Sequence, residues 1–187
     1  MREIWINWSP AVEYVASVRS AIDKSTPSVG PASHHQIVTD MRQHYGLYMF
    51  LEKKGVDKAR DEEIRDWRTE RGVKQFAKRN LVYIGIVKSE YRDFVTRMKE
   101  HEGKWLYQYK PGELFVKFGV CEHWEDEPNP DRLIEHAESV LVFEMQPYEN
   151  TDKLGSYTMR TSEDHICIHN KGHYTPLKEK MDSKKHF

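Results

Sequence analysis

Residues 81–87 read LVYIGIV, and this stretch decides how the rest of the chain is interpreted. Its β-branched and aliphatic residues predict a buried strand. Tyr83 and Gly85 are unusual there, because a glycine weakens a strand unless another group must approach its backbone closely. The stretch therefore raises the question of which group comes close to Gly85.

The segments around this strand predict an α+β domain. Apolar runs at residues 46–51 and 114–122 predict two further strands. Apolar residues at helical spacing predict amphipathic helices over residues 91–101 and 131–145. We expect a small, mainly antiparallel three-stranded sheet flanked by helices, within a single domain.

Three outer segments complete the predicted domain. Residues 1–45 predict a helical extension, in which Pro10 occupies the first position of a helix. Residues 52–80 are strongly charged, and Ile64, Trp67 and Arg71 share one helical face there, which predicts a helix between the first two strands. Residues 151–187 predict a C-terminal hairpin, with HNKG at residues 169–172 as its turn, followed by a frayed tail.

Composition limits the cellular setting. Hydrophobic residues make up 38% of the chain and charged residues 32%, as in water-soluble globular domains. No apolar run approaches the roughly 20 residues that cross a bilayer, and the N-terminus lacks the apolar core of a signal peptide. The two cysteines, Cys121 and Cys167, give no disulfide framework. We therefore expect a reducing, cytoplasmic setting without membrane association.

Charge is distributed unevenly although the net charge is only −1. Residues 74–110 carry nine Lys or Arg and four Asp or Glu, a surplus of five positive charges. Residues 111–151 carry two Lys or Arg and ten Asp or Glu, a surplus of eight negative charges. This asymmetry permits a local basic surface for a polyanion, and ordinary solvated surface is the alternative.

A carboxylate lies on the apolar side of the predicted helix over residues 131–145. At about 100° per residue, Glu138 falls roughly 40° from Ile134, close to Leu141 and Met145. A carboxylate in such a position is costly unless it is paired or binds a cation. Glu138 is therefore a candidate metal ligand, and a residue that reaches water from the edge of the stripe is the alternative.

Four further polar residues are candidates for the same cleft. Arg97 and His101 are four residues apart, on one side of their predicted helix, beside its apolar row. Tyr48 and Tyr83 come from neighbouring strands if those strands pair. Each residue taken singly is also typical of an ordinary core or edge position.

The order of these residues resembles that of the GIY-YIG nuclease superfamily. Gly46-Leu47-Tyr48 resembles the first motif, and Tyr83-Ile84-Gly85 matches the second. The Arg97-x-x-x-His101 pattern resembles the Arg-x-x-x-His helix of the family. Glu138 matches the family's metal-binding glutamate. Pro147-Tyr148-Glu149-Asn150 matches the Pro-x-x-Asn sequence that follows this glutamate in the family. The resemblance spans residues 46–150.

The spacing departs from the family pattern in two places. Between Tyr48 and Tyr83 lie 34 residues, more than is usual in the family, which is why residues 52–80 are interpreted as an insertion. The segment between Gly85 and Arg97 is also a few residues longer. Arg92 is therefore a rival for the role of the arginine, although the helical phase and His101 favour Arg97.

The resemblance implies hydrolysis of DNA phosphodiester bonds with Mg²⁺ or Mn²⁺ held by Glu138. Arg97 would bind the phosphate, and Tyr83 would orient water or phosphate. Tyr48 and His101 are both candidates for the general base, and an imidazole has the better-matched ordinary pKa. Lys88 and Arg92 would bind substrate, and Gly85 and Asn150 would support the structure. DNA is the implied partner, and a homodimer would allow both strands to be cut.

Three other interpretations stay open. In the first, the chain is a catalytically inactive nucleic-acid-binding module on the same scaffold. In the second, it is a protein-interaction domain whose acidic residues 122–131 bind a basic partner. A zinc site built from His165, Cys167, His169 and His173 matches no strong zinc spacing, and exposed hairpin histidines are an adequate explanation of the pattern.

Overall fold

The computed structural model describes residues 2–22, 32–41, 44, 46–72, 79–88, 93–122, 129–152, 154 and 165–183. The strands are β1 (Arg2–Trp8), β2 (Val12–Glu13), β3 (Gly46–Lys53), β4 (Arg79–Val87), β5 (Leu114–Glu122), β6 (Ile166–Gly172) and β7 (Lys180–Asp182). The helices are α1 (Ser20–Ile22), α2 (Ala32–Asp40), α3 (Lys58–Glu70), α4 (Phe94–Glu102) and α5 (Pro130–Met145), with a π-helical turn η1 (Tyr14–Arg19) and a 3₁₀ turn η3 (Leu106–Gln108). The predicted inner strands and helices are thus present as β3, β4, β5, α4 and α5.

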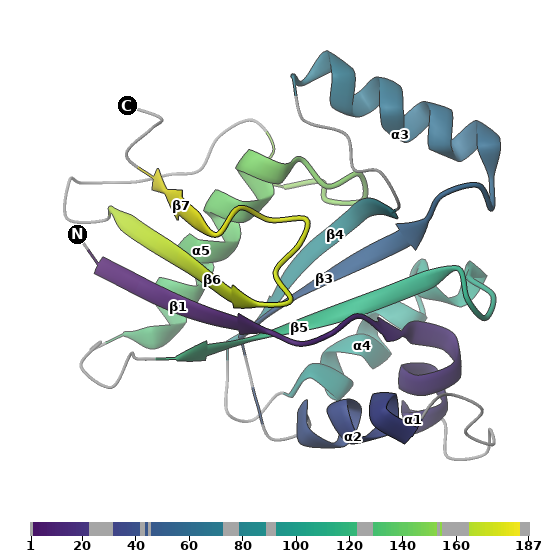
Figure 1. Ribbon diagram of the computed structural model, residues 1–187, viewed down its shortest axis with the longest axis horizontal. Coiled ribbons are helices and arrows are strands. Elements are labelled where there is room, and N and C mark those ends of the chain that lie inside the picture. The colour runs from purple at the N-terminus through teal and green to yellow at the C-terminus, as the bar shows by residue number, and fades with distance from the viewer. Residues whose placement is uncertain are drawn as a thin grey trace.

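All seven strands belong to one curled, mixed sheet with the order β4-β3-β5-β1-β6-β7, and β2 pairs with β5 (Figure 1). Strands β1 and β6 run parallel, while β3 lies antiparallel between β4 and β5. The α+β class is confirmed. The expected three-stranded sheet is wrong, because β1, β6 and β7 extend it beyond β5.

The N-terminal segment was expected to be helical, but it begins with strand β1. Ile4, Ile6 and Trp8 are buried, while Glu3 and Asn7 are exposed and Trp5 is partly exposed. This alternation has the period of a strand that buries one face. The first helical turn starts only at Tyr14, after the chain has paired β1 and β2 with β5.

The C-terminal segment also differs from the prediction, because HNKG is part of strand β6 rather than a turn. Asn170 is buried, and its side chain accepts a hydrogen bond of 2.8 Å from Trp8 Nε1 and donates one of 2.8 Å to the Lys178 carbonyl. These contacts keep residue 170 extended between neighbouring strands. The predicted tail also contributes strand β7, which pairs with β6.

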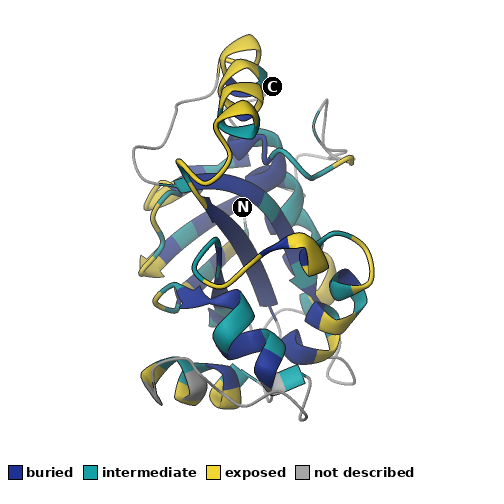
Figure 2. Ribbon diagram, turned by 90° about the vertical axis from the view of Figure 1, so that its right-hand side faces the viewer, coloured by how far each residue is buried: buried dark blue, intermediate teal, exposed yellow. Residues whose placement is uncertain are grey.

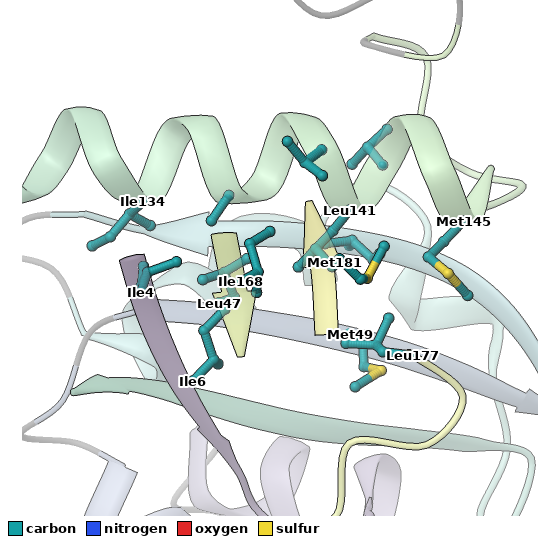
Figure 3. Packing of buried hydrophobic residues seen from close by; sticks show 14 of the residues in the cluster. Ile4, Ile6, Leu47, Met49, Ile134, Leu141, Met145, Ile168, Leu177 and Met181 are labelled. Carbon is teal, nitrogen blue, oxygen red and sulfur yellow. The ribbon is translucent and has the colours of Figure 1, made fainter. Parts of the chain in front are cut away.

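Strand β3 separates two hydrophobic cores because its successive side chains point to opposite faces. Leu47, Met49 and Leu51 pack with α5 in a core of mainly aliphatic residues, the aliphatic core (Figure 3). Tyr48 and Phe50 pack with α4 on the other face. Their partners include the rings of Tyr14, Phe94, Tyr109 and Phe118 as well as aliphatic side chains; we call this group the aromatic core.

The charged insertion forms helix α3, which stands at one end of the molecule with most of its turns exposed (Figure 2). Ile64 and Arg68 are its buried residues. The Arg60 side chain joins it to strand β3 through an ion pair with Glu52 at 2.8 Å, and to the loop after α5 through a second ion pair with Glu149. Within the described part of the chain, no helix is long and apolar enough to cross a membrane.

Candidate active site

The centre of the site is the Tyr48 phenol, which is fully buried in the aromatic core. Its oxygen lies 2.6 Å from Nε2 of His101 and accepts a hydrogen bond of 3.3 Å from Nε of Arg97. Because the guanidinium donates to this oxygen, we assign the phenol proton to the bond with His101, whose Nε2 then accepts. Both partners come from α4 and are four residues apart, so one helical face brings them to the same tyrosine.

Gly85 lies directly opposite Tyr48 in the antiparallel pair of β3 and β4. A Cβ atom at this position would lie 2.5 Å from Cζ of Tyr48 and 2.7 Å from Cε1 of Tyr83. Real Cβ contacts are never this short, so a side chain would force both rings apart. The group that approaches Gly85 is therefore the Tyr48 ring, and this explains the glycine inside the LVYIGIV strand.

Tyr83 is partly exposed and stacks against Tyr48, with ring centroids 6.0 Å apart and planes 27° apart. Burial is the main cause that raises the pKa of Tyr83, and the nearby Glu138 carboxylate raises it further. Arg97 and Tyr48 both act on the Tyr83 hydroxyl in the direction that lowers this pKa. Burial likewise raises the pKa of Tyr48 well above its ordinary value, so both phenols stay protonated near neutral pH.

A pocket of about 390 Å³ opens beside these groups, around the free edge of β4. It receives Arg97 from α4 on one side of the sheet and Glu138 from α5 on the other, with Tyr83 between them. Such a pocket is possible because β4 is the edge strand, so side chains from both faces meet around it. The complete lining consists of Tyr83, Ile86, Val87, Lys88, Arg97, Glu138, Glu149, Asn150, Thr151 and Asp152.

Asn150 closes the hydrogen bonding of the β4 edge next to the pocket. Its Oδ1 accepts from the Ile84 amide and its Nδ2 donates to the Ile84 carbonyl, both at 2.9 Å. The amide of Glu149 donates to the Val82 carbonyl at 2.6 Å. These contacts replace a missing neighbouring strand and hold the loop after α5 against β4.

The structure brings together most of the predicted site residues, but in two layers. Tyr83, Lys88, Arg97, Glu138 and Asn150 line the pocket itself. Tyr48 and His101 lie in a buried layer behind it, since their exposed fractions are 0% and 4%. Lys88 is exposed and forms an ion pair with Glu135 on α5. The rival Arg92 lies outside the described residues.

Two acidic pocket residues were missed by the sequence analysis. Glu149 and Asp152 flank Asn150 and line the same pocket as Glu138. Glu149 forms an ion pair with Arg60 of α3, so the insertion also supports one wall of the pocket. The sequence did contain a signal for both residues, because they lie close to Asn150 of the Pro-x-x-Asn motif. A loop that holds Asn150 at the pocket must place its sequence neighbours at the pocket too.

The residues present fit a divalent cation of the magnesium type. Glu138 is half-buried and offers a carboxylate, the hard oxygen donor that Mg²⁺ prefers. The pocket in front of it has room for the several waters that Mg²⁺ retains. Glu149 lines the same pocket and forms an ion pair with Arg60.

No family model, curated protein or solved structure matches the chain. The site is therefore interpreted from its own contacts and from the motifs in the sequence.

Proposed function

We propose that this chain is a metal-dependent endonuclease of the GIY-YIG type that hydrolyses phosphodiester bonds in DNA. One observation carries the proposal: Arg97, Tyr83 and Glu138, from three separate elements, line a single pocket backed by the Tyr48–His101 pair. A guanidinium, a phenol and a carboxylate around one opening provide groups for a phosphate, a water and a cation.

Arg97 is the phosphate-binding group. Burial opposes its charge, but the phenols of Tyr48 and Tyr83 and the Glu100 carboxylate raise the pKa of Arg97 overall, so the guanidinium remains cationic. Its hydrogen bond to Tyr48 and its ion pair with Glu100 fix the direction of the fork. A fixed guanidinium stabilises the negative charge that builds on phosphate oxygens during the reaction.

Glu138 would hold the divalent cation, which when bound stabilises charge on the scissile phosphate and on the leaving oxygen. The remaining steps belong to the protein's own residues. Water attacks phosphorus as a new P–O bond forms and the bond to the leaving oxygen breaks. The leaving oxygen then takes a proton from solvent.

A chain of hydroxyl groups leads the water's proton away from the pocket. In the proposed path Tyr83 takes a proton from the water and passes its own to Tyr48, on whose ring it stacks, and Tyr48 passes its own to Nε2 of His101. The two phenols end unchanged, and the imidazole becomes cationic. In this arrangement Tyr48 transmits the proton, and His101 is the general base.

The test is cleavage of supercoiled plasmid with Mg²⁺ or Mn²⁺, with a single-stranded RNA of matched length as the comparison substrate. We expect the native protein to nick the plasmid first, because one pocket serves one strand. Glu138→Gln is expected to lower the nicking rate by more than about 1,000-fold, since metal-assisted charge stabilisation is lost.

Glu144→Gln on the same helix is the matched control. Glu144 contacts Lys178 rather than the pocket, so this variant is expected to nick at the native rate. DNA binding without nicking in both native protein and Glu138→Gln would instead support a nucleic-acid-binding module. Neither binding nor nicking would support a protein-interaction domain.

A further inference from the structure

Strands β1 and β6 bring together three metal-binding side chains on the part of the sheet away from the pocket. The two strands pair in parallel, with Glu3 opposite Cys167 and Trp5 opposite His169. Ile4, Ile166 and Ile168 alternate with these residues and point into the aliphatic core. Glu3, Cys167 and His169 therefore share the opposite face of the sheet.

The three ligand atoms lie within 4.8 Å of one another. Sγ of Cys167 is 3.4 Å from Nε2 of His169, and this nitrogen is 3.6 Å from Oε1 of Glu3. In a tetrahedral zinc site with Zn–S of about 2.3 Å and Zn–N of about 2.0 Å, sulfur and nitrogen are about 3.5 Å apart. The two separations from the imidazole nitrogen are thus those of ligands around one small cation, and the sulfur lies within 4.8 Å of the carboxylate oxygen.

The surroundings hold the ligands in place without enclosing them. Cys167 is fully buried, whereas the side chains of His169 and Glu3 are 25% and 39% exposed. The imidazole stacks on Trp5, with ring centroids 4.9 Å apart and planes 8° apart. This stacking fixes the orientation of the ring, as ligand histidines require.

Four charged or titratable groups face the Cys167 thiol. Burial is the main cause that raises its pKa, the Lys180 ammonium lowers it, and the Asp182 and Glu3 carboxylates raise it. Lys180 is exposed on strand β7 and carries a flexible stem, so it can turn to solvent when another cation arrives. The two carboxylates and the imidazole favour such a cation.

We propose that Glu3, Cys167 and His169 form a zinc site between strands β1 and β6, which lie far apart in the sequence. Thiolate, imidazole and carboxylate are the ligand types that zinc takes, and three protein ligands leave the fourth position to water. The site is separate from the magnesium-type pocket, whose lining includes none of these residues. It does not depend on the proposed nuclease activity.

The test uses Co²⁺ as a spectroscopic substitute for zinc in the metal-free, full-length protein. We expect one equivalent of Co²⁺ to give tetrahedral d–d absorption together with a thiolate-to-cobalt charge-transfer band. Cys167→Ser is expected to remove the charge-transfer band. Cys121→Ser is the matched control, because Cys121 is also a free, buried cysteine but belongs to the aliphatic core, and its band is expected to persist.

Competition between Zn²⁺ and bound Co²⁺ then measures affinity. Cys167→Ser and His169→Ala are each expected to weaken zinc binding by at least about 100-fold, beyond the 10- to 100-fold typical of outer-shell changes. His173→Ala, an exposed histidine just after β6, is expected to bind zinc like the native protein.

Thermal unfolding followed by circular dichroism shows whether each variant is folded. His169→Ala keeps the proposal testable if Cys167→Ser does not fold, since His169 is partly exposed. A missing charge-transfer band in the native protein, or zinc affinity unchanged in His169→Ala, would overturn the proposal. Plasmid nicking with Mg²⁺ is expected to be unchanged in His169→Ala, which separates this test from that of the nuclease.

Discussion

The two faces of the sheet are built from different side chains. Under α5, strand β3 contributes Leu47, Met49 and Leu51 to a core of mainly aliphatic residues. Under α4, the same strand contributes Tyr48 and Phe50 to a core rich in aromatic rings. Both faces are closely packed, but the aromatic face contains buried hydroxyl and imidazole groups that are hydrogen-bonded to each other.

This difference explains on which face the candidate site lies. A tyrosine buries a large apolar ring and still presents a hydroxyl, so an aromatic core accommodates polar contacts with little loss of packing. Tyr14 bonded to Glu102 at 2.6 Å and Tyr109 bonded to Glu52 at 2.6 Å repeat this arrangement. The aliphatic face contributes to the pocket through Glu138, which reaches it around the edge strand.

The largest effect on stability is expected in the aliphatic core. Leu141→Ala removes a fully buried side chain of α5 and is expected to lower the free energy of unfolding by about 2–5 kcal/mol. Urea denaturation measures this change. Leu141→Met is the matched control and should cost less than about 1.5 kcal/mol, because it preserves volume. A large loss of nicking rate per folded molecule in Leu141→Ala would contradict a purely structural role for this face.

On the aromatic side, Arg97→Ala is expected to act on the rate instead. Loss of the fixed guanidinium should lower nicking by about 100- to 1,000-fold, since it stabilises charge in the transition state. Single-turnover kinetics with saturating enzyme measure this step. Lys99→Ala changes an exposed cation on the same helix and is expected to have little effect. Equal losses in both variants would show that α4 acts only through general charge.

Tyr48 and Tyr83 carry the same hydroxyl group in two settings: that of Tyr48 is buried, and that of Tyr83 borders the pocket. Tyr48→Phe removes a hydrogen-bonding partner of buried His101 and should lower the free energy of unfolding by about 1–3 kcal/mol. Tyr83→Phe should cost less stability, because its hydroxyl borders the pocket. Both changes interrupt the proton path, and each is expected to lower nicking by about 100-fold.

A double variant tests whether these groups act as one path. Tyr48→Phe combined with His101→Gln should be about as slow as either single variant, because residues that act as a unit are non-additive. Multiplied losses, measured in the same plasmid assay, would mean that Tyr48 and His101 act independently.

The smallest effect concerns Lys117, an ammonium group on the aliphatic side of β5. Burial lowers its pKa from 10.5 to about 8, while it donates to the carbonyls of His173 and, at 2.6 Å, Thr175. Above pH 8 the folded protein releases this proton and the unfolded chain keeps it, so stability rises with pH until about 10.5. Between pH 8 and 9 the gain should be about 1 kcal/mol relative to Lys117→Met.

Urea denaturation of both proteins at pH 8 and pH 9 measures that difference. Burial raises the pKa of Cys121, which brings a contribution of opposite sign as the unfolded thiol titrates, but this contribution is common to both proteins and cancels in the difference. A native protein that loses stability relative to Lys117→Met between these values would show that Lys117 is not buried as a cation.

Much of the candidate site was predictable because it depends on local periodicity. The helical phase alone set Glu138 beside Ile134 and Leu141, and the spacing of Arg97 and His101 put both on one helical side. The missed strand β1 also carried a local signal, the alternation of Ile4, Ile6 and Trp8, but the proline after it directed attention to a helix. The order of strands in the sheet had no such signal.

Periodicity along the chain is therefore enough for the central strands, the two helices that cover the sheet and the side that each polar residue takes. Distant pairing decided the rest: β1 beside β6, β4 at the free edge, and Tyr48 behind the pocket rather than in it. The physical reason is that strand order and side-chain exposure depend on contacts between residues far apart in sequence. Those contacts follow from how the whole chain buries its surface, which no single segment encodes.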